Sequence, residues 1–133
     1  MKSEIETLQP EAVWRHFSAI CKIPRPSGHL EKITQYILDF GKNLGLETVL
    51  DKAGNVLIRK PATPGMENRK PVVLQGHMDM VPQKNADKVH NFETDPITSY
   101  IDGEWVTANG TTLGADNGIG ISSILAILES ETL

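Results

Sequence analysis

Cysteine and long apolar segments are nearly absent from this sequence. Among 133 residues there is one cysteine, Cys21, so the chain can form neither an internal disulfide framework nor a zinc site built on cysteines. The longest apolar run near the C-terminus, residues 124–128, falls far below the ~18 residues of a membrane span, and residues 1–6 have no apolar signal core. We therefore expect a cytoplasmic protein with no membrane partner.

Basic side chains are also fewer than acidic ones. The sequence has 13 Lys and Arg against 17 Asp and Glu, a net charge of −4, which disfavours wholesale binding to a phosphate backbone, so no nucleic-acid partner is expected. Charged residues at 23% and apolar residues at 39% exclude the disordered and fibrous classes. The length fits one domain of about 150 residues.

What the sequence does contain is clear periodicity. Apolar residues recur at helical spacing over 11–21, 30–44 and 118–130, which predicts three helices. Residues 48–58 favour a hairpin or two neighbouring strands, and residues 97–107 favour a second hairpin that turns at Asp102-Gly103.

One further run bears on the fold class. Residues 72–75 begin with Val-Val-Leu, an unbroken apolar run typical of a strand buried on both faces. Helices before, between and after strands predict an α/β fold, with a mixed sheet packed by the helices and residues 72–75 as a central strand.

The first candidate site follows this run, in the segment 76–82 (Gly-His-Met-Asp-Met-Val-Pro). His77 and Asp79 are two residues apart, so on an extended chain both side chains face the same way. The ends of buried strands in α/β sheets are common ligand sites, and a carboxylate can orient a metal-binding imidazole. The alternative is that both side chains only solvate a loop.

The second candidate is Asp116, in the glycine-rich stretch 110–120 just before the last predicted helix. The glycines let the backbone approach closely, so this carboxylate could bridge two cations; alternatively, it only caps helix amide groups. A dinucleotide-binding fingerprint is excluded because Ser123 stands where the third Gly, or an Ala, belongs. The remaining histidines, His16, His29 and His90, are expected at the surface.

Together the two segments are similar to known motifs. The residues 76–82, followed by Gly-Thr-Thr-Leu-Gly-Ala-Asp-Asn-Gly-Ile-Gly over 110–120, resemble the M20 family of zinc-dependent exopeptidases. A longer match from Asn55 to Asn85 resembles the bacterial aminoacyl-histidine (Xaa-His) dipeptidases of that family. The resemblance covers essentially the whole chain and implies a layered α/β/α zinc-exopeptidase-like catalytic domain.

The resemblance also implies roles for the candidate residues. His77 matches a ligand of one Zn²⁺, Asp79 matches the outer-sphere catalytic aspartate that orients this histidine, and Asp116 matches the carboxylate that bridges both zinc ions. It further implies a cis peptide bond between Asp116 and Asn117. The implied reaction is hydrolysis of dipeptides, particularly carnosine-like Xaa-His dipeptides, by a water that two metal ions activate.

Members of this family are considerably longer than 133 residues, and their general base and remaining metal ligands follow the position of Asp116. We therefore expect residues 1–133 to be the N-terminal part of the catalytic domain, inactive alone. Apolar faces left uncovered would favour a homo-oligomer. Two alternatives stay open: another M20 amidohydrolase, such as an aminopeptidase or deacylase, or a non-catalytic binding module on the same scaffold.

Overall fold

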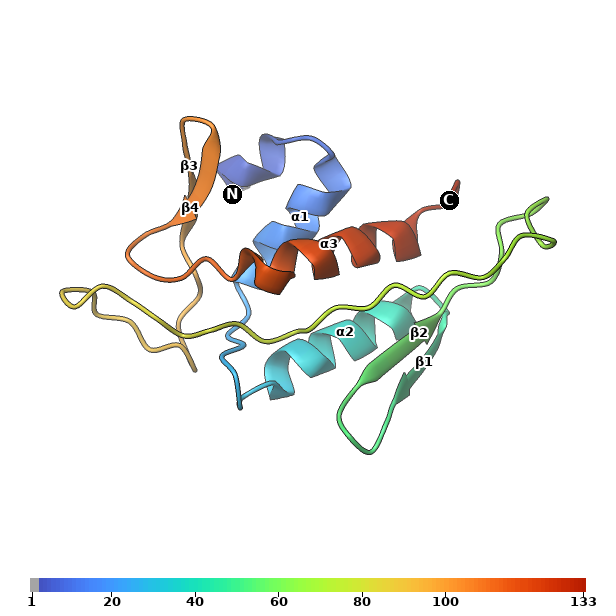
Figure 1. Cartoon of the computed structure of the whole chain (residues 1–133), viewed down its shortest axis with the longest axis horizontal. Coiled ribbons are helices and arrows are strands. Elements are labelled where there is room, and N and C mark those ends of the chain that lie inside the picture. Colours follow the sequence, from blue (N-terminus) through green and yellow to red (C-terminus); the bar gives the residue numbers. More distant parts are fainter. Residues whose placement is uncertain (1–2) are drawn as a thin grey trace.

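The structure is a computed structural model that describes residues 3–133, and it combines helices with two small hairpins (Figure 1). The helical elements are, in chain order, η1 (Glu4–Thr7), α1 (Glu11–Cys21), α2 (Glu31–Asn43) and α3 (Ala115–Glu129). The strands are β1 (Glu47–Leu50), β2 (Val56–Arg59), β3 (Ser99–Asp102) and β4 (Trp105–Ala108). β1 pairs with β2 and β3 pairs with β4, both antiparallel, in two separate sheets.

All three predicted helices are confirmed. α1 has the predicted bounds, and α2 is one residue shorter at each end than predicted. Gly45 follows α2 with φ +70°, the left-handed conformation that glycine commonly adopts just beyond a helix. Asp116 and Asn117 have non-helical backbone angles, so the regular part of α3 begins near the predicted residue 118.

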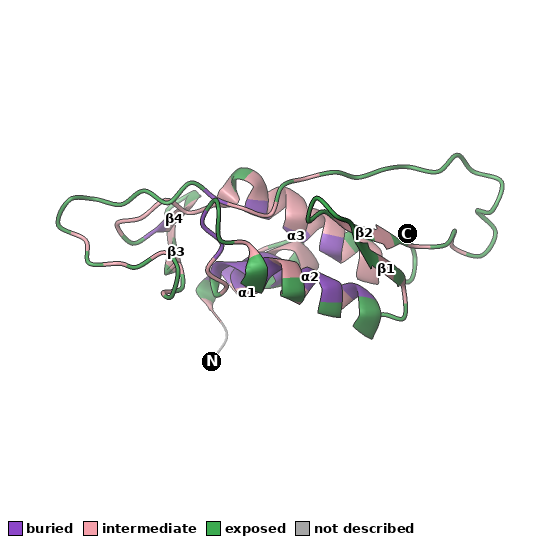
Figure 2. Ribbon diagram, turned by 90° about the horizontal axis from the view of Figure 1, so that it is seen from below, coloured by how far each residue is buried: buried purple, intermediate pink, exposed green. Residues whose placement is uncertain are grey.

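The core lies on two sides of α1. On one side, the buried side chains come from α1, α2 and α3: Ile20, Ile33, Ile37 and Leu125. On the other side, Phe17 and Cys21 pack with Ile5 of η1 against residues of the β3–β4 hairpin. Figure 2 shows these buried residues concentrated along the facing sides of the helices. The two hairpins thus lie on different parts of one helical framework.

The prediction that His16 is a surface residue is wrong. Its side chain is buried where α1, α2 and α3 meet, with Nε2 3.1 Å from a carboxylate oxygen of Glu129 and the ring edge-on to Phe40. α1 turns His16 inward next to Phe17, a detail that a helical pattern of mostly apolar residues does not reveal. His29 is exposed, as expected.

The predicted central strand is also wrong. Residues 72–75 are extended but belong to no strand, and Val72 and Val73 are 78% and 89% exposed. In Figure 1 this part of the chain crosses between α3 and the α2–β2 region. A strand is buried on both faces only if neighbours pair with its edges and helices cover it, and no strand within residues 3–133 pairs with this run. The described chain therefore contains two hairpins in place of the predicted mixed sheet.

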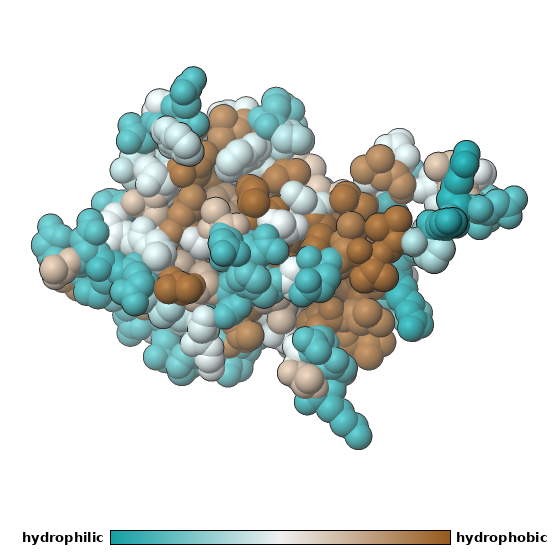
Figure 3. All heavy atoms as spheres, in the orientation of Figure 1, coloured by the Kyte–Doolittle hydropathy of each residue, from teal (hydrophilic) through white to brown (hydrophobic). Residues whose placement is uncertain are grey.

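Apolar side chains accordingly reach the surface. Val72, Val73 and Leu74 are exposed, as are Leu57 of β2 and Ile127 of α3. Figure 3 shows apolar atoms gathered over the region of α3 and β2. This exposure agrees with the expectation of uncovered apolar faces, whereas self-association stays a prediction. Among residues 3–133 the structure has no helix with the length and hydrophobicity that a bilayer crossing requires.

Candidate active site

The extended segment brings His77 and Asp79 to one place, as their spacing predicts. Nδ1 of His77 lies 3.0 Å from Oδ1 of Asp79 and 3.2 Å from the main-chain oxygen of the same residue. The side chain of His77 is 51% exposed and that of Asp79 is 34% exposed, so the pair is open to a ligand. An imidazole whose Nδ1–H is held by a carboxylate presents Nε2 as a free acceptor.

The same imidazole meets Asp116 with its other nitrogen. Nε2 of His77 lies 3.0 Å from Oδ1 of Asp116, although 39 residues separate the two positions. Gly114 is the N-cap of α3, and the carboxylate of Asp116 turns toward His77 instead of capping that helix. The Asp116–Asn117 peptide bond is cis, as the resemblance implied. The structure thus places all three predicted residues in one cluster, with the imidazole between two carboxylates.

Hydrogen bonds within this cluster shift the pKa values of His77 and Asp79 toward their charged forms. The hydrogen bond from His77 to Asp116 is the main cause that raises the pKa of His77, and Asp79 adds to it while partial burial opposes it. The hydrogen bond from Ser27 is the main cause that lowers the pKa of Asp79, with a further contribution from His77. Asp79 is therefore an ionised acceptor near neutral pH.

Two residues of the site were missed in the sequence, and both lie in the segment 24–28 between α1 and α2. Ser27 donates its hydroxyl to Oδ2 of Asp79 at 2.5 Å, and its amide donates to the main-chain oxygen of Met80 at 3.1 Å. Arg25 is buried beneath the same segment. The composition Pro-Arg-Pro-Ser-Gly indicated a break between helices, and nothing local in it indicates which distant carboxylate or carbonyl a side chain meets.

The side chain of Asn117 packs against two glycines of the motifs, Gly76 and Gly120, and leaves no room for a side chain at either position. A Cβ on Gly76 would lie 2.9 Å from Nδ2 of Asn117, and one on Gly120 would lie 2.1 Å from its Oδ1. The amide side chain therefore occupies the space that side chains at these two positions would need. This packing holds the start of the first segment against the first turn of α3.

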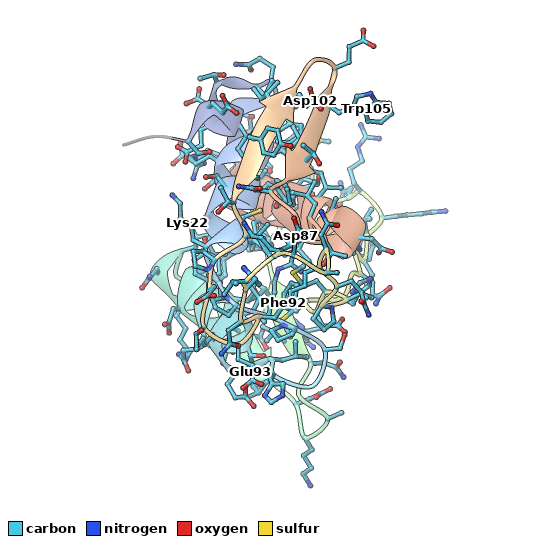
Figure 4. The ribbon with its side chains drawn as sticks, turned by 90° about the vertical axis from the view of Figure 1, so that its left-hand side faces the viewer. Lys22, Asp87, Phe92, Glu93, Asp102 and Trp105 are labelled. Carbon is cyan, nitrogen blue, oxygen red and sulfur yellow. The ribbon has the colours of Figure 1, made fainter. Side chains whose placement is uncertain are left out.

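A hollow adjoins the site on the side of Ser27. It is lined by loop residues Pro26, Ser27, His29, Pro82, His90, Asn91, Phe92 and Glu93. Figure 4 shows Phe92 and Glu93 well separated from Asp102 and Trp105 of the β3–β4 hairpin, which lies at the other end of the molecule in that view. The hairpin tip is therefore a suitable place for control substitutions.

The donor atoms fit part of a zinc site. Nitrogen and oxygen ligands at about 2.0–2.2 Å from a tetrahedral zinc lie about 3.3–3.6 Å from each other, a few tenths of an ångström more than the 3.0 Å between Nε2 of His77 and Oδ1 of Asp116. Asp79 behind Nδ1 completes the carboxylate–histidine arrangement usual at metal sites. Within residues 3–133, however, there is no group of three or more His, Cys, Asp or Glu side chains that could hold a metal ion. The described residues therefore supply a partial ligand set.

Comparisons with known proteins show which class of protein the chain resembles. The chain is 60% identical over 131 residues, 98% of its length, to a protein named cytosol non-specific dipeptidase from Escherichia coli strain K12. The crystal structure of aminoacylhistidine dipeptidase from Vibrio alginolyticus matches 98% of the chain with 60% identity and a TM-score of 0.96. The chain is homologous to part of these dipeptidases. It spans 27% of the length of each.

A more distant likeness concerns the fold alone. The crystal structure of a tripeptidase from Staphylococcus aureus matches 90% of the chain at 18% identity with a TM-score of 0.66. Both solved structures are peptidases, so the mixed arrangement of helices and hairpins is that of part of a peptidase fold. No protein-family model matches the chain.

Proposed function

We propose that this chain forms part of the active site of a zinc-dependent dipeptidase of the M20 family. Within these residues His77 and Asp116 would hold the metal, His77 as a ligand of one Zn²⁺ ion and Asp116 as the carboxylate shared by two, and Asp79 would be the catalytic aspartate behind His77. The observation that supports this most strongly is the imidazole of His77 between two carboxylates from segments far apart in sequence. The 60% identity to dipeptidases over nearly the whole chain supports the reaction class.

Each residue has a distinct task in this proposal. Asp79 accepts a hydrogen bond from Nδ1–H of His77, which orients the imidazole with Nε2 turned toward Asp116. A metal ion at Nε2 would take the place of the proton that the Nε2–Asp116 hydrogen bond requires. Ser27 holds the other carboxylate oxygen of Asp79, so the aspartate keeps its charge and orientation. When bound at these residues, the metal would supply Lewis-acid chemistry, that is, polarisation of the scissile carbonyl and a water molecule acidic enough to provide hydroxide near neutral pH.

The proposal extends to the whole polypeptide. Residues 1–133 form the N-terminal part of a layered α/β/α catalytic domain, and the remaining ligands and the general base come from outside them. Support comes from the partial ligand set and from the exposed apolar run 72–74, which a larger domain would cover. We place the enzyme in the cytoplasm as a homo-oligomer that acts on small peptides and binds neither nucleic acid nor membranes.

The substrate class is the most specific part of the proposal. The names of the two similar proteins indicate dipeptides, one broadly and the other with histidine at the second position. We favour Xaa-His dipeptides, including carnosine-like β-alanyl compounds, among the substrates.

An activity panel tests this proposal. The full-length polypeptide that contains these residues, purified and supplied with zinc, is assayed on Ala-His, β-Ala-His, Ala-Leu, a tripeptide and an N-acetyl amino acid. Hydrolysis of the dipeptides that disappears with a chelator, and in His77→Ala, is the expected result. Preference for the tripeptide or the N-acetyl compound would instead indicate another amidohydrolase. Absence of any hydrolysis by the zinc-loaded protein would favour a binding module.

A further inference from the structure

We infer that Arg25 is a positioning residue, which holds the segment carrying His77 and Asp79 in a fixed relation to the segment carrying Asp116. This inference rests on the proposed function, because it assigns Arg25 to the assembly of the same site. Arg25 touches none of the reacting groups; it acts through the main chain of the residues that bear them.

The guanidinium joins the two segments directly. Nη1 donates to the main-chain oxygens of Met78 at 3.0 Å and Asp79 at 3.2 Å, and Nη2 donates to the main-chain oxygen of Gly114 at 2.7 Å. Met78 follows His77 immediately, and Gly114 precedes Asp116 by two residues. One side chain therefore links both sides of the His77–Asp116 contact.

The main chain beside Arg25 strengthens this link. The amide of Met80 donates to the main-chain oxygen of Arg25 at 3.0 Å, and Pro26 forms an isolated parallel bridge with Met80. The segment 25–27 thus runs along residues 79–80 like a short strand. The Arg25 side chain leaves this paired backbone and reaches across to the N-terminus of α3, so main-chain hydrogen bonds hold the residue from which the guanidinium extends.

The environment of the guanidinium is unusual for a structural arginine. Arg25 is 2% exposed, and the hydrogen-bond partners of its guanidinium among residues 3–133 are main-chain carbonyl oxygens. Nε is buried without a hydrogen-bond partner in that part of the chain. Burial of a cation costs free energy unless its donors are satisfied. A side chain chosen for packing alone would be apolar at this position, so the charge and the planar fork need another explanation.

Two glycines of the second motif make room for this side chain. A Cβ on Gly114 would lie 2.6 Å from Nη2 of Arg25, and one on Gly118 would lie 2.7 Å from the same atom. Asp116 stands between these two glycines in sequence. The glycine pattern around the bridging carboxylate is thus complementary to a guanidinium, independently of the hydrogen bonds themselves.

A lysine at position 25 cannot donate to both segments as the two terminal nitrogens of Arg25 do. A guanidinium presents donors on separate nitrogens in a rigid plane, whereas an ammonium group is a single point on a flexible stem. Arg25→Lys therefore keeps the charge and most of the volume but loses the simultaneous link to both segments. Arg25→Met removes the charge as well. Arg59→Lys on β2 is the control, because Arg59 is exposed and pairs with Glu47 away from the site.

The experiment uses the full-length polypeptide and measures zinc affinity by competition with a chromophoric chelator. Loss of a group that orients ligands typically costs 10–100-fold in metal affinity, so we expect about tenfold or more in Arg25→Lys and Arg25→Met and no change in Arg59→Lys. Activity should fall in kcat with little change in KM, because Arg25 is buried and its guanidinium bonds to main-chain oxygens. Wild-type zinc affinity in a folded Arg25→Lys protein would overturn the inference.

A second readout separates positioning from stability alone and does not depend on activity. In the metal-free protein, amide hydrogen exchange should become faster at residues 76–80 and 114–118 in Arg25→Lys, while the α1–α2 core keeps its protection. An even increase over all helices would show a merely structural role and overturn the inference.

Gly118→Ala is the second variant if both Arg25 variants fail to fold, because its added Cβ would crowd Nη2 of Arg25 from α3. The same faster exchange at residues 76–80 and 114–118 is expected, and unchanged exchange at these residues would also overturn the inference. A wild-type protein that binds no zinc would refute the proposed function, while the exchange pattern still tests Arg25.

Discussion

Replacing Asp79 by asparagine removes the negative charge beside His77 with almost no change in side-chain shape. In the native site Oδ1 of Asp79 lies 3.0 Å from Nδ1 of His77, and Oδ2 accepts the hydroxyl of Ser27 at 2.5 Å. The asparagine oxygen can still face Nδ1, and the main-chain oxygen of residue 79 stays 3.2 Å from it. The orientation of the imidazole is therefore largely kept, and the lost quantity is the charge that makes His77 a stronger metal ligand.

The size of the effect follows from these contacts. Removal of a carboxylate behind a metal-binding histidine costs about 10–100-fold in metal affinity. Asp79→Asn should lie at the lower end, about tenfold, which corresponds to about 1.4 kcal/mol of binding free energy. Asp79→Ala also removes the side-chain partner of Ser27 and should lie at the upper end, about 100-fold. Because Asp79 also has a proposed catalytic role, the loss of kcat can exceed the loss of affinity.

The assay is zinc competition with a chromophoric chelator, on the full-length polypeptide at pH 7. Asp102→Asn is the matched control, since Asp102 is an exposed carboxylate on the β3–β4 hairpin, at the far end of the molecule from Phe92 and Glu93 in Figure 4. Zinc affinity unchanged in Asp79→Ala would refute the role given to this residue. Complete loss of one zinc would make Asp79 a direct ligand and would refute it equally.

Three further predictions concern the folded chain. Burial raises the pKa of the Cys21 thiol to about 11, so Cys21 should resist alkylation by iodoacetamide in native protein and react after denaturation, as peptide mass spectrometry would show. Burial lowers the pKa of His16 from 6.5, against the opposing effect of Glu129, so the folded state binds fewer protons than the unfolded state below that value. The contribution of His16 to thermal stability should therefore fall as pH is lowered below about 7, whereas the raised pKa of His77 acts in the opposite direction. The melting temperature of the wild type minus that of His16→Gln isolates the His16 contribution, and a difference that grows as pH is lowered would contradict the burial argument. The 133-residue chain alone should self-associate through the exposed run 72–74, and sedimentation velocity of a Val73→Glu variant should shift it toward monomer.

The helices and hairpins could be predicted because their signals are local. Apolar spacing defines α2 without reference to the rest of the chain, and Gly103, with φ +59°, marks the turn between β3 and β4. The run 72–75 could not be placed correctly, since burial of a strand depends on partners elsewhere in the chain. The apolar residues of this run are typical of a buried strand, but no strand within residues 3–133 pairs with it.

In the candidate site, too, the contact between residues close in sequence could be predicted, whereas the contacts between distant segments could not be predicted from local patterns. The shared direction of His77 and Asp79 follows from their spacing on an extended segment, and the structure confirms it. Their meeting with Asp116 was accessible only through the resemblance of the two motifs, because 39 residues and several turns separate them from it. Ser27 and Arg25 act through long-range hydrogen bonds from a segment whose composition indicates only a break between helices.

Zinc stoichiometry tests the central claim, that His77 and Asp116 are ligands of a two-metal site, most directly. Calorimetric titration of the metal-free, full-length polypeptide should show two zinc ions per chain in the wild type. His77→Ala should weaken mainly one of the two sites, because its imidazole serves a single ion, whereas Asp116→Ala should weaken both, because a bridging carboxylate serves two. Wild-type protein that binds no zinc, or an Asp116→Ala variant that still binds two zinc ions with wild-type affinity, would contradict the account.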